Sequence, residues 1–285
     1  MSRIAYVNGR YLGRRDAMVH VEDRGYQFAD GVYEVCEVRG GRIVDERRHM
    51  VRLQRSLAEL RIPMPMSLVA LGLVLRETIH RNLVRGGIVY LQITRGVARR
   101  DHGFPPAGTR PSVVVMARNV DPAGNERVAS EGISVITVPD TRWQRVDIKS
   151  TSLLPNVLAK QAARERGARE AWLVDRDGFV TEGSSSNAWI VTDQGRVLTR
   201  PADSGILRGI TRTVLIDAIQ AQGMALEERT FTVAEAYGAR EAFITGASQT
   251  VMPVVRIDEH KIADGKPGPL AMALRRDFHN FAEST

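Results

Sequence analysis

The chain has 285 residues, 43% of them hydrophobic, with a formal net charge of +7 and a pI near 10. This length fits one large or two medium domains with a substantial core. The apolar runs are far too short to span a bilayer, and the first residues lack the apolar core and cleavage site of a secretory signal. A single cysteine, Cys36, excludes an internal disulfide, so the reducing cytoplasm is the expected location and no membrane association is expected.

The basic charge raises the possibility of nucleic-acid binding. Arginine pairs such as Arg14–Arg15 and Arg99–Arg100 lie far apart in the sequence and near acidic residues, and aromatic residues make up only 6% of the chain. Basic and aromatic residues are not interleaved as they are in surfaces that stack bases. An arginine-rich surface with a mild preference for small anions is therefore expected, and a basic nucleic-acid-binding protein without catalysis is the alternative from another class.

The first part of the chain predicts short strands and two helices. Alternating residues indicate strands, Asn8-Gly9 indicates a hairpin turn, and apolar residues three or four apart indicate a helix. In chain order the prediction is a strand at 4–7, a strand at 32–38, a helix at 46–60, a helix from Ser67 to about 83, and paired strands at 88–94 and 112–117.

The second part begins after a polar stretch at 119–126, which is the best candidate for a linker. The elements predicted beyond it are a strand at 133–138, a helix at about 155–166, strands at 171–174 and 188–191, a helix from Gly209 to near Gly223, and a last strand at 242–245. Strands and helices do not alternate strictly, which favours α+β domains over a doubly wound parallel sheet.

Lysine is scarce: of 40 basic residues, only Lys149, Lys160, Lys261 and Lys266 are lysines. A desolvated lysine can lose its proton and attack a carbonyl group, whereas an arginine cannot. Lys149 alone lies in a segment expected to be partly buried and rich in cations, two conditions that favour the neutral amine. Lys149 is therefore the candidate nucleophile, and an ordinary exposed lysine is the alternative.

Three segments of the second half suit a phosphorylated cofactor. Gly205–Arg212 enters a helix, whose first N–H groups attract phosphate, and Thr245–Ser248 ends a strand in small and hydroxyl residues. Each of these signals is weak by itself, and helix capping is the alternative explanation. In Thr181–Asn187, Glu182 could hold a proton on a pyridine nitrogen, and an exposed glutamate in a serine-rich turn is the alternative.

Arg100 and His102 are two residues apart, so in an extended segment both side chains point to the same side. An arginine fork with an imidazole donor can bind a carboxylate. A solvated basic loop is the alternative. The six histidines are scattered without close ligand pairs, so no metal site is expected.

Taken together and in this order, these segments resemble the fold-type IV pyridoxal-phosphate enzymes, and most closely the bacterial D-amino-acid transaminases. The resemblance runs from Tyr6 to Val255, and it implies a two-domain α+β fold with the cofactor in the interdomain cleft. The implied domains are a small N-terminal one at 1–119 and a large C-terminal one at 120–285 that carries the catalytic lysine. The segments that carry the resemblance are Gly25–Glu34, His49–Leu53, Asp147–Ser150, Thr181–Asn187 and Gly205–Thr211.

The resemblance also implies roles for single residues. Lys149 would form the Schiff base with pyridoxal 5′-phosphate, and Glu182 would pair with the pyridine nitrogen. Leu207 would pack against the ring, and Arg142 would lie near its phenolic oxygen. The residues implied for the phosphate are Arg52, Gly209, Ile210, Thr211, Ala247 and Ser248, with Ser248 replacing the hydroxyl that relatives often carry at the position of Ala247.

The substrate is implied by Arg100 and His102 together with Tyr33. In D-amino-acid transaminases a similar Arg-x-His pair from the neighbouring subunit binds the α-carboxylate, which implies a homodimer. The implied reaction moves an amino group between a D-amino acid and a 2-oxo acid, in two half-reactions. The alternatives are branched-chain L-aminotransferases and, less so, aminodeoxychorismate lyases, because both share the cofactor residues. Both lack the Arg-x-His pair.

Overall fold

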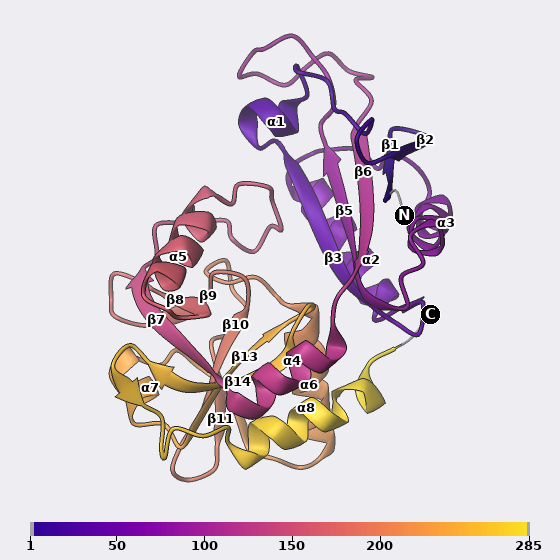
Figure 1. Cartoon of the computed structure of the whole chain (residues 1–285). Coiled ribbons are helices and arrows are strands. Elements are labelled where there is room, and N and C mark those ends of the chain that lie inside the picture. The colour runs from indigo at the N-terminus through magenta and orange to yellow at the C-terminus, as the bar shows by residue number, and fades with distance from the viewer. Residues whose placement is uncertain (1–2, 284–285) are drawn as a thin grey trace. The chain divides into compact units, whose positions relative to one another are not determined.

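The computed structural model of the chain describes residues 3–283, which divide into two compact units (Figure 1). The first unit contains residues 3–122, the short segment Ile148–Ser152 and Glu283; the second contains Ala123–Asp147 and Leu153–Ala282. Ile148–Ser152, which includes Lys149, thus packs with the N-terminal half of the chain. The division into domains at residue 120 stays a prediction.

The first unit is built on a six-stranded sheet in the order β2-β1-β6-β5-β3-β4, in which every neighbouring pair is antiparallel. Its elements are β1 (Ile4–Val7), β2 (Arg10–Gly13), α1 (Arg24–Phe28), β3 (Gly31–Arg39), β4 (Arg42–Ile43), α2 (Glu46–Glu59), α3 (Leu68–Arg81), β5 (Gly86–Thr94) and β6 (Ser112–Asn119).

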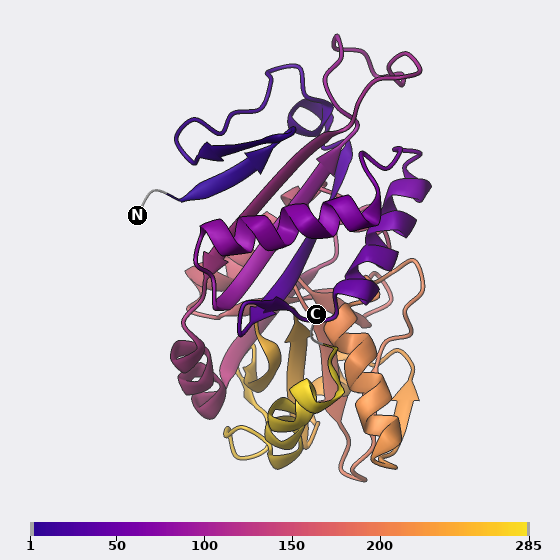
Figure 2. The same cartoon turned by 90° about the vertical axis from the view of Figure 1, so that its right-hand side faces the viewer.

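Helices α2 and α3 cover one face of this sheet, as Figure 2 shows. The alternation of β3 points every second side chain, including Glu34 and Cys36, towards that face. The apolar stripe of α2, with Leu53 and Leu57, packs into the same core. Glu34 is the exception in this row, because a charged side chain there must find a buried partner.

The second unit is built on a nine-stranded mixed sheet in the order β12-β11-β10-β13-β14-β7-β8-β9, with β15 paired to β14. Its elements are α4 (Pro122–Glu131), β7 (Ile133–Pro139), α5 (Leu154–Glu165), β8 (Glu170–Val174), β9 (Val180–Gly183), β10 (Asn187–Val191), β11 (Val197–Thr199), α6 (Ile210–Ala221), β12 (Leu226–Glu228), α7 (Val233–Tyr237), β13 (Glu241–Gly246), β14 (Thr250–Ile257), β15 (His260–Lys261) and α8 (Pro269–Phe281).

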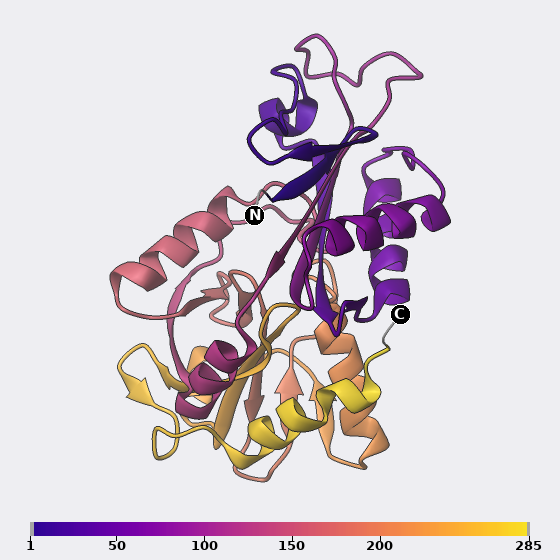
Figure 3. The same cartoon turned by 45° about the vertical axis from the view of Figure 1, so that its right-hand side comes forward.

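Helices α6 and α8 lie side by side in this unit (Figure 3) and bury one apolar cluster with the strands beneath them. Trp189 and Phe243 stack at the centre of that cluster, with ring centroids 5.5 Å apart. A separate cluster forms around Trp172 and Phe231. The sheet is therefore buried over both faces, which explains why strands such as β10 are buried at every position.

Most predicted elements are confirmed, including the hairpin at Asn8-Gly9, the pairing of β5 with β6, and the start of α6 after Gly209. Two predictions are wrong. The expected linker at 119–126 contains the beginning of α4, since proline is compatible with the first turn of a helix. The strand expected to be the last is followed by β14, β15 and α8. Within residues 3–283, no helix is both long and apolar enough to cross a bilayer.

Candidate active site

Lys149 belongs to a short segment that runs along the edge of β3. Its backbone carbonyl accepts a hydrogen bond from the N–H of Tyr33 at 3.0 Å, and its own N–H donates to the Ser56 hydroxyl of α2 at 3.3 Å. Val32 and Ser150 form the adjacent β-bridge. These contacts with β3 and α2 fix the backbone of Lys149. The position of its side chain then depends only on its rotamer.

The amine of Lys149 lies 4.1 Å from the centroid of the Tyr33 ring. Within residues 3–283, no hydrogen bond or ion pair engages this amine. Lys160, by contrast, donates to the Arg169 carbonyl at 2.6 Å and lies 3.3 Å from the Glu170 carboxylate. Lys149 is partly buried as predicted, and its amine is available to a carbonyl compound, which Lys160 is not.

Arg52 is held by a buried carboxylate. Glu34 accepts from Nε of Arg52 at 2.8 Å and from its Nη2 at 2.7 Å, and Nδ1 of His49 lies 2.7 Å from the same carboxylate. Burial by itself raises the pKa of Glu34, but the charge and hydrogen bonds of Arg52 and His49 lower it to about 2. Burial lowers the pKa of His49, so the imidazole is neutral at pH 7. Glu34 therefore fixes a charged guanidinium in one orientation.

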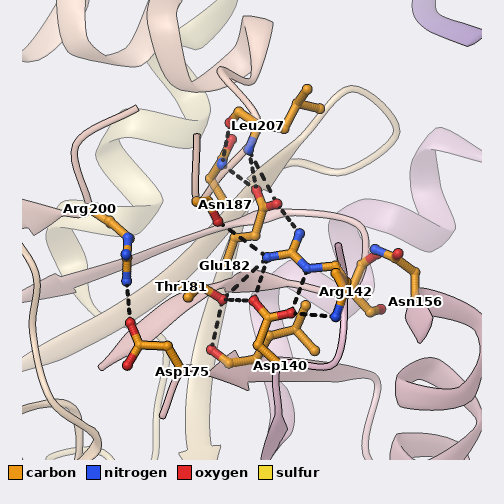
Figure 4. Close-up of polar contacts among 12 residues, drawn as sticks. Asp140, Arg142, Asn156, Asp175, Thr181, Glu182, Asn187, Arg200 and Leu207 are labelled. Carbon is orange, nitrogen blue, oxygen red and sulfur yellow. Dashed lines mark hydrogen bonds and ion pairs between the residues drawn. The ribbon is translucent and has the colours of Figure 1, made fainter. Parts of the chain in front are cut away.

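Glu182 stands at the centre of a polar cluster in the second unit, shown in Figure 4. Its carboxylate accepts hydrogen bonds from Nη1 of Arg142, from Nδ2 of Asn187 at 3.0 Å and from the backbone N–H of Leu207 at 3.2 Å. Glu182 lies in β9 and is buried, with 5% of its surface exposed. The alternative of an exposed glutamate is thereby excluded.

Arg142 connects two carboxylates. Its Nε and Nη2 donate to Asp140 at 2.9 and 2.7 Å, in addition to the contact with Glu182. Burial lowers the pKa of Arg142, but the hydrogen bonds and charges of Asp140 and Glu182 raise it well above its ordinary value. Burial likewise raises the pKa of Asp140, and Arg142 reverses this, so that the pKa is lowered. The expected contact of Arg142 with a phenolic oxygen stays a prediction.

Asn187 connects Glu182 to the start of α6. Its amide donates both to Glu182 and, at 2.9 Å, to the Leu207 carbonyl. A Cβ on Gly209 would lie 2.1 Å from Oδ1 of Asn187, so only glycine fits at that position. Gly209 is the N-cap of α6 and supplies no side chain to the helix N-terminus, where Ile210 and Thr211 begin the first turn. The dipole and first N–H groups of that turn suit an anion.

Ala247 and Ser248 lie in the turn between β13 and β14. The Ser248 carbonyl accepts a hydrogen bond from Nδ2 of Asn125 at 3.1 Å, which ties the turn to α4. The expected contacts of these two residues with phosphate stay predictions. The same holds for the packing of Leu207 on a ring, because the contacts of Leu207 with Glu182 and Asn187 are made by its backbone.

Arg100 and His102 are exposed in the loop between β5 and β6. Both lie beside the ring of Phe28 in α1: the guanidinium carbon is 5.2 Å from the ring centroid, and the imidazole centroid is 5.5 Å from it. The two side chains thus gather on one aromatic ring. Tyr33 stacks on Tyr90 with centroids 5.9 Å apart, in addition to its contact with Lys149.

Sequence reasoning missed several residues of these clusters. Glu34 and His49 were not singled out, although a glutamate in the buried row of a strand and a histidine three residues from Arg52 on a helix face are both visible in the sequence. Asp140 and Asn187 were missed although each lies close in sequence to a partner, Arg142 and Glu182 respectively, because nothing in the local pattern shows that their side chains are buried and paired.

A sequence model of the family described as amino-transferase class IV matches residues 31–257. The chain belongs to the class IV aminotransferase family. It is 38% identical over 279 residues to a D-alanine aminotransferase from Staphylococcus haemolyticus, with 98% of each chain covered. It is 41% identical over 273 residues to a D-alanine aminotransferase from Bacillus licheniformis, with 96% of this chain and 95% of the relative covered.

The fold of this aminotransferase is also found among solved structures. A branched-chain amino acid aminotransferase from T.th., solved with pyridoxamine 5′-phosphate, matches with a TM-score of 0.89 and 26% identity, covering 98% of this chain and 94% of the other. The expected α+β fold of fold-type IV aminotransferases is confirmed.

Proposed function

We propose that this aminotransferase uses pyridoxal 5′-phosphate to transfer an amino group between a D-amino acid, such as D-alanine, and a 2-oxo acid, such as 2-oxoglutarate. The observation that carries the proposal is the likeness to D-alanine aminotransferases along nearly the whole chain, at 38 and 41% identity. The likeness to the branched-chain enzyme of known structure is lower, at 26%. Arg100 and His102, gathered on one ring, supply suitable carboxylate-binding groups.

The donor set fits the proposed cofactor. The amine of Lys149, which makes no ion pair within residues 3–283, suits an aldehyde, and the buried carboxylate of Glu182 suits a protonated ring nitrogen. Arg52 and the N-terminus of α6 at Ile210 and Thr211 suit a phosphate. Ala247 and Ser248 are proposed to add hydroxyl or backbone donors to the same phosphate.

Bound pyridoxal phosphate supplies an electron sink for the bond that breaks at the substrate Cα, and it carries the amino group from the amino acid to the second 2-oxo acid. The Lys149 amine would accept the Cα proton as the amino acid becomes a 2-oxo acid. It would deliver a proton to Cα when another 2-oxo acid becomes the amino acid. Glu182, fixed by Arg142, Asn187 and the backbone N–H of Leu207, would keep the ring nitrogen protonated. Arg142 holds that carboxylate in place.

The hand of the substrate follows from where its carboxylate is bound. The proton on Cα must face the Lys149 amine, and the carboxylate fixes a second direction at the same carbon. Moving the carboxylate to another side therefore inverts the accepted enantiomer. We assign this choice to Arg100 and His102, assisted by Tyr33, and the resemblance implies that the pair acts in the partner subunit of a homodimer. The single, buried Cys36 is compatible with a cytoplasmic enzyme.

The cofactor chemistry is tested by incubating the purified protein with pyridoxal phosphate and recording its visible absorption. Reduction with borohydride and peptide mapping then locate the label. We expect a yellow protein labelled on Lys149. A colourless protein, or a label on Lys160, Lys261 or Lys266, would refute the assignment, and a colourless protein retained on DNA would favour the nucleic-acid alternative.

The substrate is tested by comparing D-alanine with L-leucine, each with 2-oxoglutarate as acceptor. We expect turnover of D-alanine, and a loss of about tenfold to 100-fold in kcat/KM for Arg100→Ala, the value of a hydrogen bond to a charged group. Arg110→Ala, an exposed arginine at the base of the same loop, is the control and should retain activity. Preferred turnover of L-leucine would instead support the branched-chain alternative.

A further inference from the structure

The loop between β5 and β6 is closed tightly at its base. Gly96 has a φ of +100°, and a Cβ there would lie 2.0 Å from the Arg110 carbonyl oxygen. The Gly96 carbonyl accepts a hydrogen bond from the N–H of Arg24 at 2.9 Å, and Ala98 N–H donates to the Glu22 carbonyl at 3.3 Å. The first residue of α1 and the segment before it therefore anchor the start of the loop that carries Arg100 and His102.

Phe28, the last residue of α1, lies under the side chains of the proposed carboxylate pair. Its ring centroid is 5.2 Å from the Arg100 guanidinium carbon and 4.8 Å from that of Arg24, and 5.5 Å from the His102 ring centroid at an interplanar angle of 56°. A guanidinium near an aromatic face is attracted by the quadrupole of the ring. Phe28 therefore holds the side chains of Arg100 and His102 beside the same ring.

Arg24 fixes the backbone between the two members. It is buried, with 3% of its surface exposed, and its Nη1 donates to the carbonyl of Asp101 at 2.6 Å. Its Nε donates to the Asp30 carboxylate at 2.8 Å. Asp101 is the residue that separates Arg100 from His102. The guanidinium of Arg24 thus sets the position of the peptide from which both side chains project.

Asp30 and Arg95 extend this support to the far side of the loop. Nε and Nη2 of Arg95 donate to Asp30 at 2.7 and 2.9 Å, and the Arg95 guanidinium carbon lies 3.8 Å from the centroid of the Phe104 ring. Burial raises the pKa of Asp30, but hydrogen bonds from Arg95 and Arg24 lower it below its ordinary value. The carboxylate is therefore ionised at neutral pH and binds both arginines.

We infer that Phe28 and Arg24 are positioning residues that hold Arg100 and His102 in the geometry required to bind the substrate carboxylate. This inference rests on the proposed function, because it assigns a support to the carboxylate pair of that same site. Neither residue touches the substrate or moves a proton. Their loss therefore weakens the binding of carboxylates and leaves the proton transfer at Cα unchanged.

The first test is Phe28→Leu, which keeps an apolar side chain and removes the ring. Phe28→Leu removes two cation–ring contacts, and each contact corresponds to a factor of roughly two to five in a binding constant. We therefore expect a rise of about tenfold in the KM for D-alanine and in the inhibition constant of propionate. We expect kcat at saturating D-alanine to change by less than about twofold. Phe28→Tyr keeps the ring and should restore both constants. An unchanged KM, or a loss confined to kcat, would overturn the inference.

The second test asks whether Phe28 acts through the pair. In an Arg100→Ala/His102→Ala background, Phe28→Leu should cause no further loss in kcat/KM for D-alanine, since the groups it positions are absent. A residue that only stabilises the fold would lower activity by the same factor in both backgrounds. Equal factors would therefore contradict a positioning role.

A third measurement does not depend on activity. Hydrogen exchange of the peptide covering residues 97–110 should be faster in Phe28→Leu and in Arg24→Met than in the wild type. Arg81→Met is the control, because Arg81 also pairs with a carboxylate and lies over an aromatic ring, that of Tyr11. Unchanged exchange would refute the support of the loop. Failure of the wild type to use D-alanine would refute the proposed function. The exchange measurement would still test whether Phe28 and Arg24 hold the loop in place.

Discussion

Replacement of Glu34 by glutamine removes the charge that compensates a buried arginine. The pKa of Glu34 falls from its ordinary value of 4.5 to about 2, despite burial that acts in the opposite direction, because Arg52 and His49 favour the ionised form. A depression of that size corresponds to about 3 kcal/mol of folding free energy at pH 7. The amide of glutamine retains one acceptor and places an N–H group against the donors of Arg52. We expect Glu34→Gln to lose roughly 3 kcal/mol, in line with broken buried ion pairs.

Urea denaturation of the cofactor-free protein at several pH values measures this loss. Because the folded pKa is lowered, the stabilisation is fully present above about pH 4.5 and disappears as the pH falls towards 2. The difference in unfolding free energy between wild type and Glu34→Gln should therefore be constant from pH 7 to about 5 and shrink below pH 4.5. The affinity for pyridoxal phosphate should fall as well, since Arg52 is no longer fixed.

Glu77→Gln is the matched control, because Glu77 also pairs with an arginine of the same unit. Nε of Arg81 lies 2.7 Å from the Glu77 carboxylate, but both side chains are 40% or more exposed. An exposed pair contributes at most about 1 kcal/mol. If Glu34→Gln and Glu77→Gln lowered the unfolding free energy equally, or if the effect of Glu34→Gln did not depend on pH, the reasoning from burial would be refuted.

Two further predictions concern packing around glycine and cysteine. Gly209→Ala should weaken pyridoxal phosphate binding about tenfold or more, because its Cβ would lie 2.1 Å from Oδ1 of Asn187 and displace Asn187, which donates to the Glu182 carboxylate; spectrophotometric titration measures this. Gly86→Ala, where the nearest atom is 3.6 Å away, should bind normally, and equal affinities in both variants would contradict the argument. Cys36, whose pKa burial raises well above its ordinary value, should resist iodoacetamide at pH 8 in the folded protein and react after unfolding; rapid labelling of the native enzyme would count against this environment.

Much of the fold follows from local patterns, and two of the missed helices, α4 and α8, share a cause. Strands β1, β3, β5 and β6 and helices α2, α3, α5 and α6 show clear periodicity, so their positions could be predicted within a few residues. Helices α4 and α8 begin at Pro122 and Pro269, within stretches rich in glycine, proline and polar residues. Such a composition resembles a loop, although proline at the first position suits a helix. The starts of α4 and α8 therefore could not be told from loops by composition.

The candidate site divides between local and distant information. Lys149, Glu182 and the start of α6 were recognisable because each lies within a short motif. The pairing of Arg142 with Glu182 joins residues 40 apart in the sequence. Unlike a helix or a strand, such an ion pair produces no periodic pattern from which it could be predicted. The same limit applies to Phe28, whose contacts with the loop depend on how α1 folds against the end of β5.

The two glutamates show how buried charge can be used in opposite ways. Glu34, with the neutral His49, compensates the single charge of Arg52, so the first cluster orients a cation without a net charge of its own. Glu182 and Asp140 both accept hydrogen bonds from the guanidinium of Arg142, so in the second cluster a cation orients carboxylates. The backbone of Leu207 and the amide of Asn187 add to this hold on Glu182. A carboxylate fixed in this way favours a positive group beside it, and a protonated pyridine nitrogen is such a group, in agreement with the role proposed for Glu182.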